Sequence, residues 1–174
     1  MTIADCTLYD VEGVNFYNVT FDHCDLSYVD FTKVVLYQST AFKGCLLANA
    51  RLPHTNVTLI DTDASWCDWR AARADIVAVL SEYPSEVPAL LRAIQEGHID
   101  GTVYSGPCAC LMGTIANARQ CNVDDLPTDS ERPAELFFLG IRAGDTPETN
   151  QFSALAERWV RQWLEHMQAA FGCK

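Results

Sequence analysis

The chain has 174 residues, 49% of them hydrophobic, which is enough for one or two hydrophobic cores. Its 23 acidic and 12 basic residues give a formal net charge of -11, which argues against a generic nucleic-acid-binding surface. Its apolar runs are far shorter than the roughly 18 residues of a membrane span, and residues 1–10 hold two aspartates and no basic residue. We therefore expect no membrane segment, no signal or transit peptide, and a cytoplasmic location.

A five-residue period runs through the first third of the chain. Each step of five reaches an apolar residue, a small or apolar residue stands two places before it, and the residue between them is mostly Asp or Asn. The central residues of this series are Cys6, Val11, Phe16, Phe21, Leu26, Phe31 and Leu36. Neither the helix period near 3.6 nor strand alternation at 2 produces this pattern, which indicates a repeated short strand and turn.

The segments VNFYN, VTFDH, CDLSY, VDFTK and VVLYQ resemble the unit of the pentapeptide-repeat family: a small residue, Asp or Asn, Leu or Phe, a polar residue and a variable one. The resemblance implies a β-solenoid, specifically a right-handed quadrilateral β-helix with one pentapeptide on each side and four in each coil. We expect this β-helix to occupy residues 1–65 with about three coils, because solenoid units bury their faces only against neighbouring units.

Four repeats per coil predict columns of stacked central residues. The register slips by one residue after Gln38, where an inserted residue such as Ser39 is predicted to form a bulge. The predicted columns are Cys6, Leu26 and Leu47; Val11, Phe31 and Leu52; Phe16, Leu36 and Val57; and Phe21 and Phe42. Three of the eight cysteines, Cys6, Cys24 and Cys45, are expected to point inward as compact hydrophobic residues, with their thiols reduced.

From residue 66 the period becomes helical, and we expect a mostly α-helical C-terminal domain over residues 66–174 that caps the β-helix. Helices are predicted over 65–82, 85–97 and 107–119, the third with Gly106 as its N-cap. An acidic loop over 122–133 precedes a strand or short helix over 136–141. A long terminal helix should then bury Trp159 and Trp163, against its own domain, the β-helix or a second copy.

A cysteine at the start of the third predicted helix is the candidate for chemistry, since a helix N-terminus stabilises a thiolate. Cys108 falls on the apolar face, whereas Cys110 lies where a substrate could reach it, with His98 or His166 available as a base. Packing is the simpler explanation of these residues, and we predict no catalytic residue. Phosphate-binding loops and nucleophile elbows are not found in the sequence.

A zinc site is the second chemical alternative, with His98, Cys108, Cys110 and Cys121 as a conceivable ligand set. Residues two apart on a helix point about 200 degrees away from each other, so Cys108 and Cys110 bind one ion only if they lie in a loop. We therefore expect no cofactor.

The acidic side chains of the repeats are the predicted interaction site. Residues 1–65 hold eight acidic and three basic residues, and residues 66–174 hold fifteen and nine, so both parts are acidic. On the β-helix, Asp5 is predicted over Asp25 and Asp10 over Asp30, about 4.8 Å apart. The full predicted set is Asp5, Asp10, Glu12, Asp22, Asp25 and Asp30. A solvated surface that aids solubility is the simpler interpretation.

The resemblance supplies a functional hypothesis. Pentapeptide-repeat proteins that protect bacterial topoisomerases from quinolones are acidic rods of DNA-like size that occupy the DNA-binding saddle of gyrase. We therefore predict a non-enzymatic interaction protein, bacterial or phage, that blocks or modulates a nucleic-acid-binding enzyme of the gyrase or host-defence type, with no direct binding to nucleic acid or membrane. The alternatives are a thiol enzyme or zinc module centred on residues 98–121, and a homodimeric scaffold.

Overall fold

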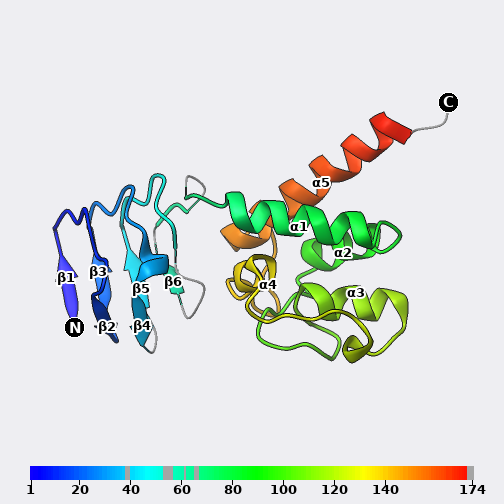
Figure 1. The fold of residues 1–174 in the computed structure, drawn as a ribbon, viewed down its shortest axis with the longest axis horizontal. Coiled ribbons are helices and arrows are strands. Elements are labelled where there is room, and N and C mark those ends of the chain that lie inside the picture. Colours follow the sequence, from blue (N-terminus) through cyan, green and yellow to red (C-terminus); the bar gives the residue numbers. More distant parts are fainter. Residues whose placement is uncertain (38–39, 53–56, 61, 65–66, 172–174) are drawn as a thin grey trace. The chain divides into compact units, whose positions relative to one another are not determined.

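The structure is a computed structural model that describes the chain except residues 38–39, 53–56, 61, 65–66 and 172–174. The chain divides into two compact units, residues 1–70 and residues 71–174. Short strands make up the first unit and helices the second (Figure 1). Each unit is described by itself below.

The N-terminal unit is built from short parallel strands. One sheet has the order β1 (Thr2–Ala4), β3 (Thr20–Asp22), β5 (Thr40–Lys43), β6 (Val57–Ile60), and a second sheet pairs β2 (Asn15–Tyr17) with β4 (Val35–Tyr37). All of these pairings are parallel. Single parallel bridges join Thr7 to Asp25, Asp25 to Leu46, and Asp30 to Arg51. The chain therefore passes the same positions repeatedly, one layer at a time.

Much of the predicted stacking is confirmed by the strand registers. Phe21 lies beside Phe42, and Phe16 lies beside Leu36. Tyr17 pairs with Tyr37, twenty residues on, whereas Thr20 pairs with Ala41, twenty-one residues on, so the one-residue slip is also confirmed. Gln38 and Ser39, where we expected the bulge, lie outside the described residues.

Two of the predicted columns are wrong at the ends of the stack. Thr7 bridges to Asp25, eighteen residues on, which places Cys6 beside Cys24 instead of Leu26. Val57 pairs with Thr40, seventeen residues on, instead of following Leu36. The expected spacing of twenty residues between stacked positions fails there because the first and last passes are shorter than four full repeats. The inward positions keep their alignment while the number of residues at the corners changes.

A cluster of phenylalanine rings forms the centre of this unit. The rings of Phe21 and Phe42 stack with centroids 5.2 Å apart, and Phe31 meets both of them edge to face. All three side chains are completely buried. Offset and edge-to-face aromatic pairs contribute about 0.5–1.5 kcal/mol each beyond their area burial, so this cluster is a main source of stability.

The corners between the sides use left-handed backbone. Asp5, His23 and Gly44 occupy one corner on three successive passes, with φ values of 49°, 53° and 59°. Tyr28 and Asn49 occupy the next corner with φ values of 66° and 56°. A Cβ atom on Gly44 would lie 2.9 Å from the His23 ring, so the glycine provides room for the stacked imidazole.

The C-terminal unit is helical, and its helix boundaries differ from the predicted ones. Its helices are α1 (Arg70–Glu82), α2 (Val87–Gln95), α3 (Leu111–Arg119), α4 (Pro133–Phe138) and α5 (Gln151–Phe171), with short 3-10 turns at η1 (Phe31–Lys33) in the first unit and η2 (Val123–Asp125) in the second. The segment 136–141 is thus partly helix α4. Gly106 is not an N-cap, because residues 99–110 are held by a bridge between Ile99 and Ala109 and by the bond from the Cys110 N–H to the Val103 carbonyl.

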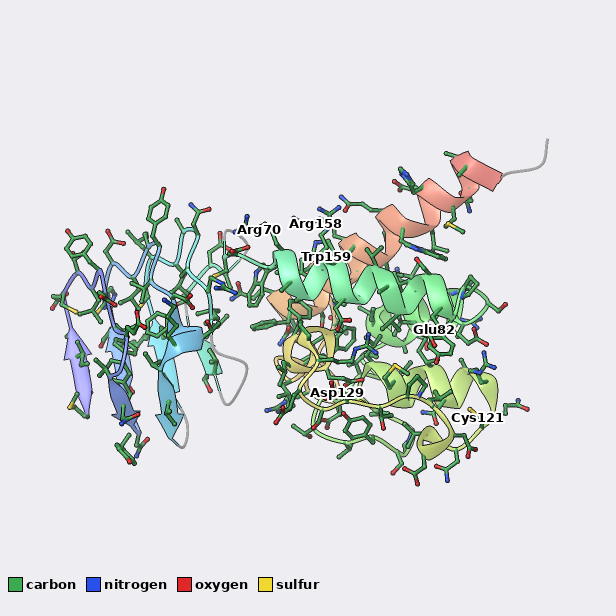
Figure 2. All side chains as sticks on the ribbon, in the orientation of Figure 1. Arg70, Glu82, Cys121, Asp129, Arg158 and Trp159 are labelled. Atoms are coloured by element: carbon green, nitrogen blue, oxygen red, sulfur yellow. The ribbon has the colours of Figure 1, made fainter. Side chains whose placement is uncertain are left out.

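The terminal helix packs on its own unit. Helix α5 contacts α2, and the Trp163 Nε1–H donates to Ser81 Oγ of α1 at 3.2 Å. The Trp159 side chain, labelled in Figure 2, lies 4.9 Å from the Phe137 ring of α4, measured between ring centroids. The predicted burial of both tryptophans is confirmed. Among the described residues, no helix is both long enough and apolar enough to cross a membrane.

Candidate functional site

Cys110 is not accessible to a substrate. The prediction of an accessible thiol is wrong because α3 begins at Leu111, four residues later than expected, which changes the direction of every side chain in the segment. Cys110 is completely buried. Burial first, and then the nearby charge of Glu135, raises the pKa of the Cys110 thiol to about 12. A thiol with so high a pKa supplies almost no thiolate at neutral pH, which disfavours Cys110 as a nucleophile.

Glu135 is a buried carboxylate that lies next to Cys110 at the start of α3. Its carboxylate accepts the Met112 backbone N–H at 2.8 Å and so caps the first turn of α3, where Cys110 makes no side-chain cap. Burial raises the pKa of Glu135. Sequence reasoning missed this residue. The available signal was a single acidic residue inside the apolar segment PAELFF.

The zinc ligand set does not assemble. His98 is exposed and its Nδ1 lies 3.5 Å from Glu96 Oε2, Cys110 is buried against Glu135, and Cys108 and Cys121 are half-buried. Within the described parts of the chain, no three His, Cys, Asp or Glu residues are grouped so as to hold a metal ion. Of the three cysteines in residues 98–121, Cys110 is the one that packs in the interior.

Several of the predicted interaction residues hold turns. The side chains of Asp10, Asp25 and Asp30 each accept a backbone N–H two residues on, from Glu12, Ser27 and Thr32, at 2.9–3.0 Å. Hydrogen bonds from Ser27 lower the pKa of Asp25. Burial acts to raise the pKa of Asp30, but hydrogen bonds from Thr32 and the charge of Arg51 outweigh it and lower that pKa. These aspartates therefore have a local structural role as well as a charge.

Half of the predicted acidic residues are paired with a base. Lys33 lies 3.3 Å from Glu12, Lys43 lies 3.6 Å from Asp22, and Arg51 lies 3.0 Å from Asp30. The predicted stacking of Asp5 over Asp25 is wrong, since Asp25 lies between Thr7 and Leu46, and Asp30 has Arg51 as its ladder neighbour. A regular column of carboxylates is thus replaced by alternating acidic, basic and apolar side chains.

The remaining carboxylates gather along one side of the N-terminal unit. We call this side the ladder face, defined by Thr7, Asp25 and Leu46 in one ladder, Asp5 and Tyr28 at its corners, and Tyr9 and Asp10 just after it. In the part of the chain that the structure describes, Asp5, Asp10 and Asp25 have no ion-pair partner.

Large apolar side chains accompany these carboxylates. Tyr9 is 86% exposed, Tyr28 is 76% exposed and Leu46 is 63% exposed. Sequence reasoning named the aspartates of this face and missed the role of its tyrosines. Tyr28 and Leu46 stand at outward positions, where the repeat does not constrain the residue type. Tyr9 stands two places before Val11, where the repeat predicts an inward side chain, and that prediction is wrong for Tyr9.

An open groove of about 530 Å³ lies between α1 and α5 of the helical unit. Arg73, Gln162, Glu165 and His166 line it together with the edges of the tryptophans. Arg73 Nη2 donates to Gln162 Oε1 at 3.2 Å, which joins the two walls. Because Trp159 and Trp163 are buried, they do not supply an exposed dimer surface, and the homodimeric scaffold stays a prediction.

Comparison with known proteins supports the reading of the repeats. Residues 10–38 match the family model described as Pentapeptide repeats (8 copies), and the match includes no residue of the helical unit. No curated protein and no solved structure matches the chain. The predicted resemblance of the N-terminal part to pentapeptide repeats is confirmed.

Proposed function

We propose that the pentapeptide repeats fold as a short right-handed quadrilateral β-helix that serves as a non-enzymatic protein-binding module. The parallel pairing on every side supports the β-helix, as does the stepping of the register by seventeen to twenty-one residues. Such a solenoid presents flat, rigid outer faces, which suit docking to another protein.

The ladder face is the proposed docking surface. The exposed Leu46 is the ladder neighbour of Asp25, and the exposed Tyr28 stands at the next corner of the chain. These apolar side chains share the face with Asp5, Asp10 and Asp25, the three carboxylates that have no ion-pair partner among the described residues, and this combination is the observation that carries the proposal. Tyrosine is enriched among the residues that dominate binding energy at interfaces, because it buries a large area at a small cost in conformational entropy. The carboxylates select a basic partner surface.

The proposed partner is a nucleic-acid-handling enzyme, of the gyrase or host-defence type, in a bacterium or a phage-infected cell. The groove with which such an enzyme holds phosphates is basic, and the net charge of -11 favours association with it. Leu46 and Arg51 interrupt the carboxylate rows on the third pass. We therefore propose that charge brings the partners together and that the apolar side chains hold them, in place of a close copy of the DNA phosphate pattern.

Affinity capture from a bacterial lysate tests the proposal. The tagged full chain is the bait, and bound proteins are identified by mass spectrometry at low salt and at roughly half-molar salt, where exposed charges are strongly screened. We expect a nucleic-acid-handling enzyme to be retained at low salt and largely released at high salt. Capture of proteins with no basic nucleic-acid groove, or retention independent of salt, would contradict the proposed partner.

A further inference from the structure

Two cysteines of the N-terminal unit lie side by side on adjacent passes. The Cys6 thiol donates a hydrogen bond to the Cys24 sulfur, with the two Sγ atoms 3.3 Å apart. The ladder places them in register, since Ala4 pairs with Asp22 before them and Thr7 bridges to Asp25 after them. Both side chains point into the same column, although the two residues are eighteen positions apart in the chain.

This arrangement brings the two sulfur atoms close enough for a disulfide to form after a small movement. Residues paired across neighbouring strands lie about 4.8 Å apart, within the Cα separation of about 4.4–6.8 Å at which disulfides form. The sulfur atoms need to approach by only about 1.3 Å to reach the bond length of about 2.05 Å. Cys6 is half-buried, so a small reagent can reach its sulfur, whereas Cys24 is 1% exposed.

We propose that Cys6 and Cys24 are a redox modification site that closes to an intramolecular disulfide in the presence of a small-molecule disulfide. The Cys6 thiolate attacks one sulfur of the small disulfide, breaks its S–S bond and releases one small thiolate. Cys24, after losing its proton to solvent, then attacks the Cys6 sulfur and displaces the second small thiolate. Two protein thiols are oxidised, and one small disulfide is reduced to two thiols.

Cys45 is not part of the pair, although it belongs to the same region. Its thiol donates to the Phe21 and Lys43 carbonyl oxygens at 3.4 Å, and it is buried. The oxidised bond therefore joins the first pass of the chain to the second.

The rate of closure should depend on pH. Burial first, then the Cys24 thiol, then the charges of Cys45 and Asp5, raise the pKa of Cys6 to about 11. The thiolate fraction of Cys6 therefore grows about tenfold for each pH unit between 7 and 10, and the rate of the first attack grows with it.

Trypsin provides a direct test on the full chain. The peptide Met1–Lys33 contains Cys6 and Cys24, no other cysteine and no internal Lys or Arg, so trypsin leaves it intact. The protein is incubated with oxidised glutathione, quenched in denaturant with N-ethylmaleimide, and digested. We expect this peptide to lose two hydrogen atoms in mass and to carry no maleimide, and to do so faster as pH rises.

Cysteine-to-serine variants show whether the bond joins Cys6 to Cys24. Cys6→Ser and Cys24→Ser should each abolish the unlabelled peptide, and Cys67→Ser, a control at another buried thiol, should leave it unchanged. Two maleimide labels on the peptide at every pH would overturn the proposal. So would a stable glutathione adduct on Cys6 with Cys24 labelled, or a crosslink from Cys24 to the peptide that contains Cys45.

Discussion

Asp75 of α1 and Arg132, which immediately precedes α4, form a two-point ion pair. Arg132 Nη2 lies 2.6 Å from Asp75 Oδ1, and Arg132 Nε lies 2.9 Å from Asp75 Oδ2. The same carboxylate accepts the Ala134 backbone N–H at 2.9 Å, so it also caps the first turn of α4. This one side chain joins two helices that are far apart in the sequence.

Substitution of Asp75 by Asn should destabilise the protein by about 2 kcal/mol at pH 7, because it leaves the largely buried guanidinium without its counter-charge. Hydrogen bonds from Arg132 lower the pKa of Asp75 although burial opposes them. A carboxyl with a lowered pKa adds stability above its unfolded value of about 3.9 and loses it as pH falls through the folded value. Urea unfolding at several pH values should therefore show a difference that is full at pH 6 and shrinks below about pH 4. A constant difference down to the lowest pH would contradict this account.

Glu135→Gln tests a pH dependence of stability that is opposite in sign to that of Asp75. Burial raises the pKa of Glu135, so the folded state binds a proton more readily than the unfolded state, and this residue's contribution falls as pH rises above the ordinary glutamate range. A glutamine oxygen still accepts the Met112 N–H. We expect the variant to match the native protein near pH 4 and to equal or exceed its stability at pH 8 in urea unfolding. Glu131→Gln, on the exposed loop nearby, is the matched control and should show no such trend.

Gly113→Ala tests the close approach between α3 and the loop that precedes it. A Cβ atom at residue 113 would overlap the Tyr104 carbonyl oxygen and lie 2.7 Å from the Ala109 Cβ. Backbone cannot move aside as a flexible side chain can, so we expect a loss of about 3 kcal/mol or more in the free energy of unfolding. Gly13→Ala meets no atom within 4 Å and carries only the cost of its φ of +76°, about 1–2 kcal/mol. Equal losses for the two variants would contradict the steric explanation.

The fold was more predictable from sequence than the candidate site. The five-residue period identified the inward positions of Phe21 and Phe42 correctly, because burial restricts those positions to apolar residues of similar size. The number of residues per pass was not predictable at the ends of the stack, since corner residues carry no burial signal. This is why the neighbour of Cys6 was wrongly predicted.

In the helical unit, the main error was the predicted first residue of α3, which sets the phase of the helix, that is, the direction in which each of its side chains points. Gly106 and Pro107 are typical of a helix start, but the bridge between Ile99 and Ala109 and the bond from the Cys110 N–H to the Val103 carbonyl hold that segment as a loop. Whether Cys110 faces solvent depends on this phase. Glu135 was missed for a different reason, because its partner at Met112 lies twenty-three residues away.

The most direct measurement of the central claim compares bait variants in the lysate capture. The double variant Asp10→Asn with Asp25→Asn removes two charges from the ladder face, and an asparagine oxygen keeps each turn because it accepts the same backbone N–H. Asp124→Asn with Asp125→Asn removes two charges from the exposed turn η2 as the matched control. We predict that capture of the salt-sensitive enzyme falls at least about tenfold for the first double variant and stays unchanged for the control. Equal capture by both would contradict a role for the ladder face in binding.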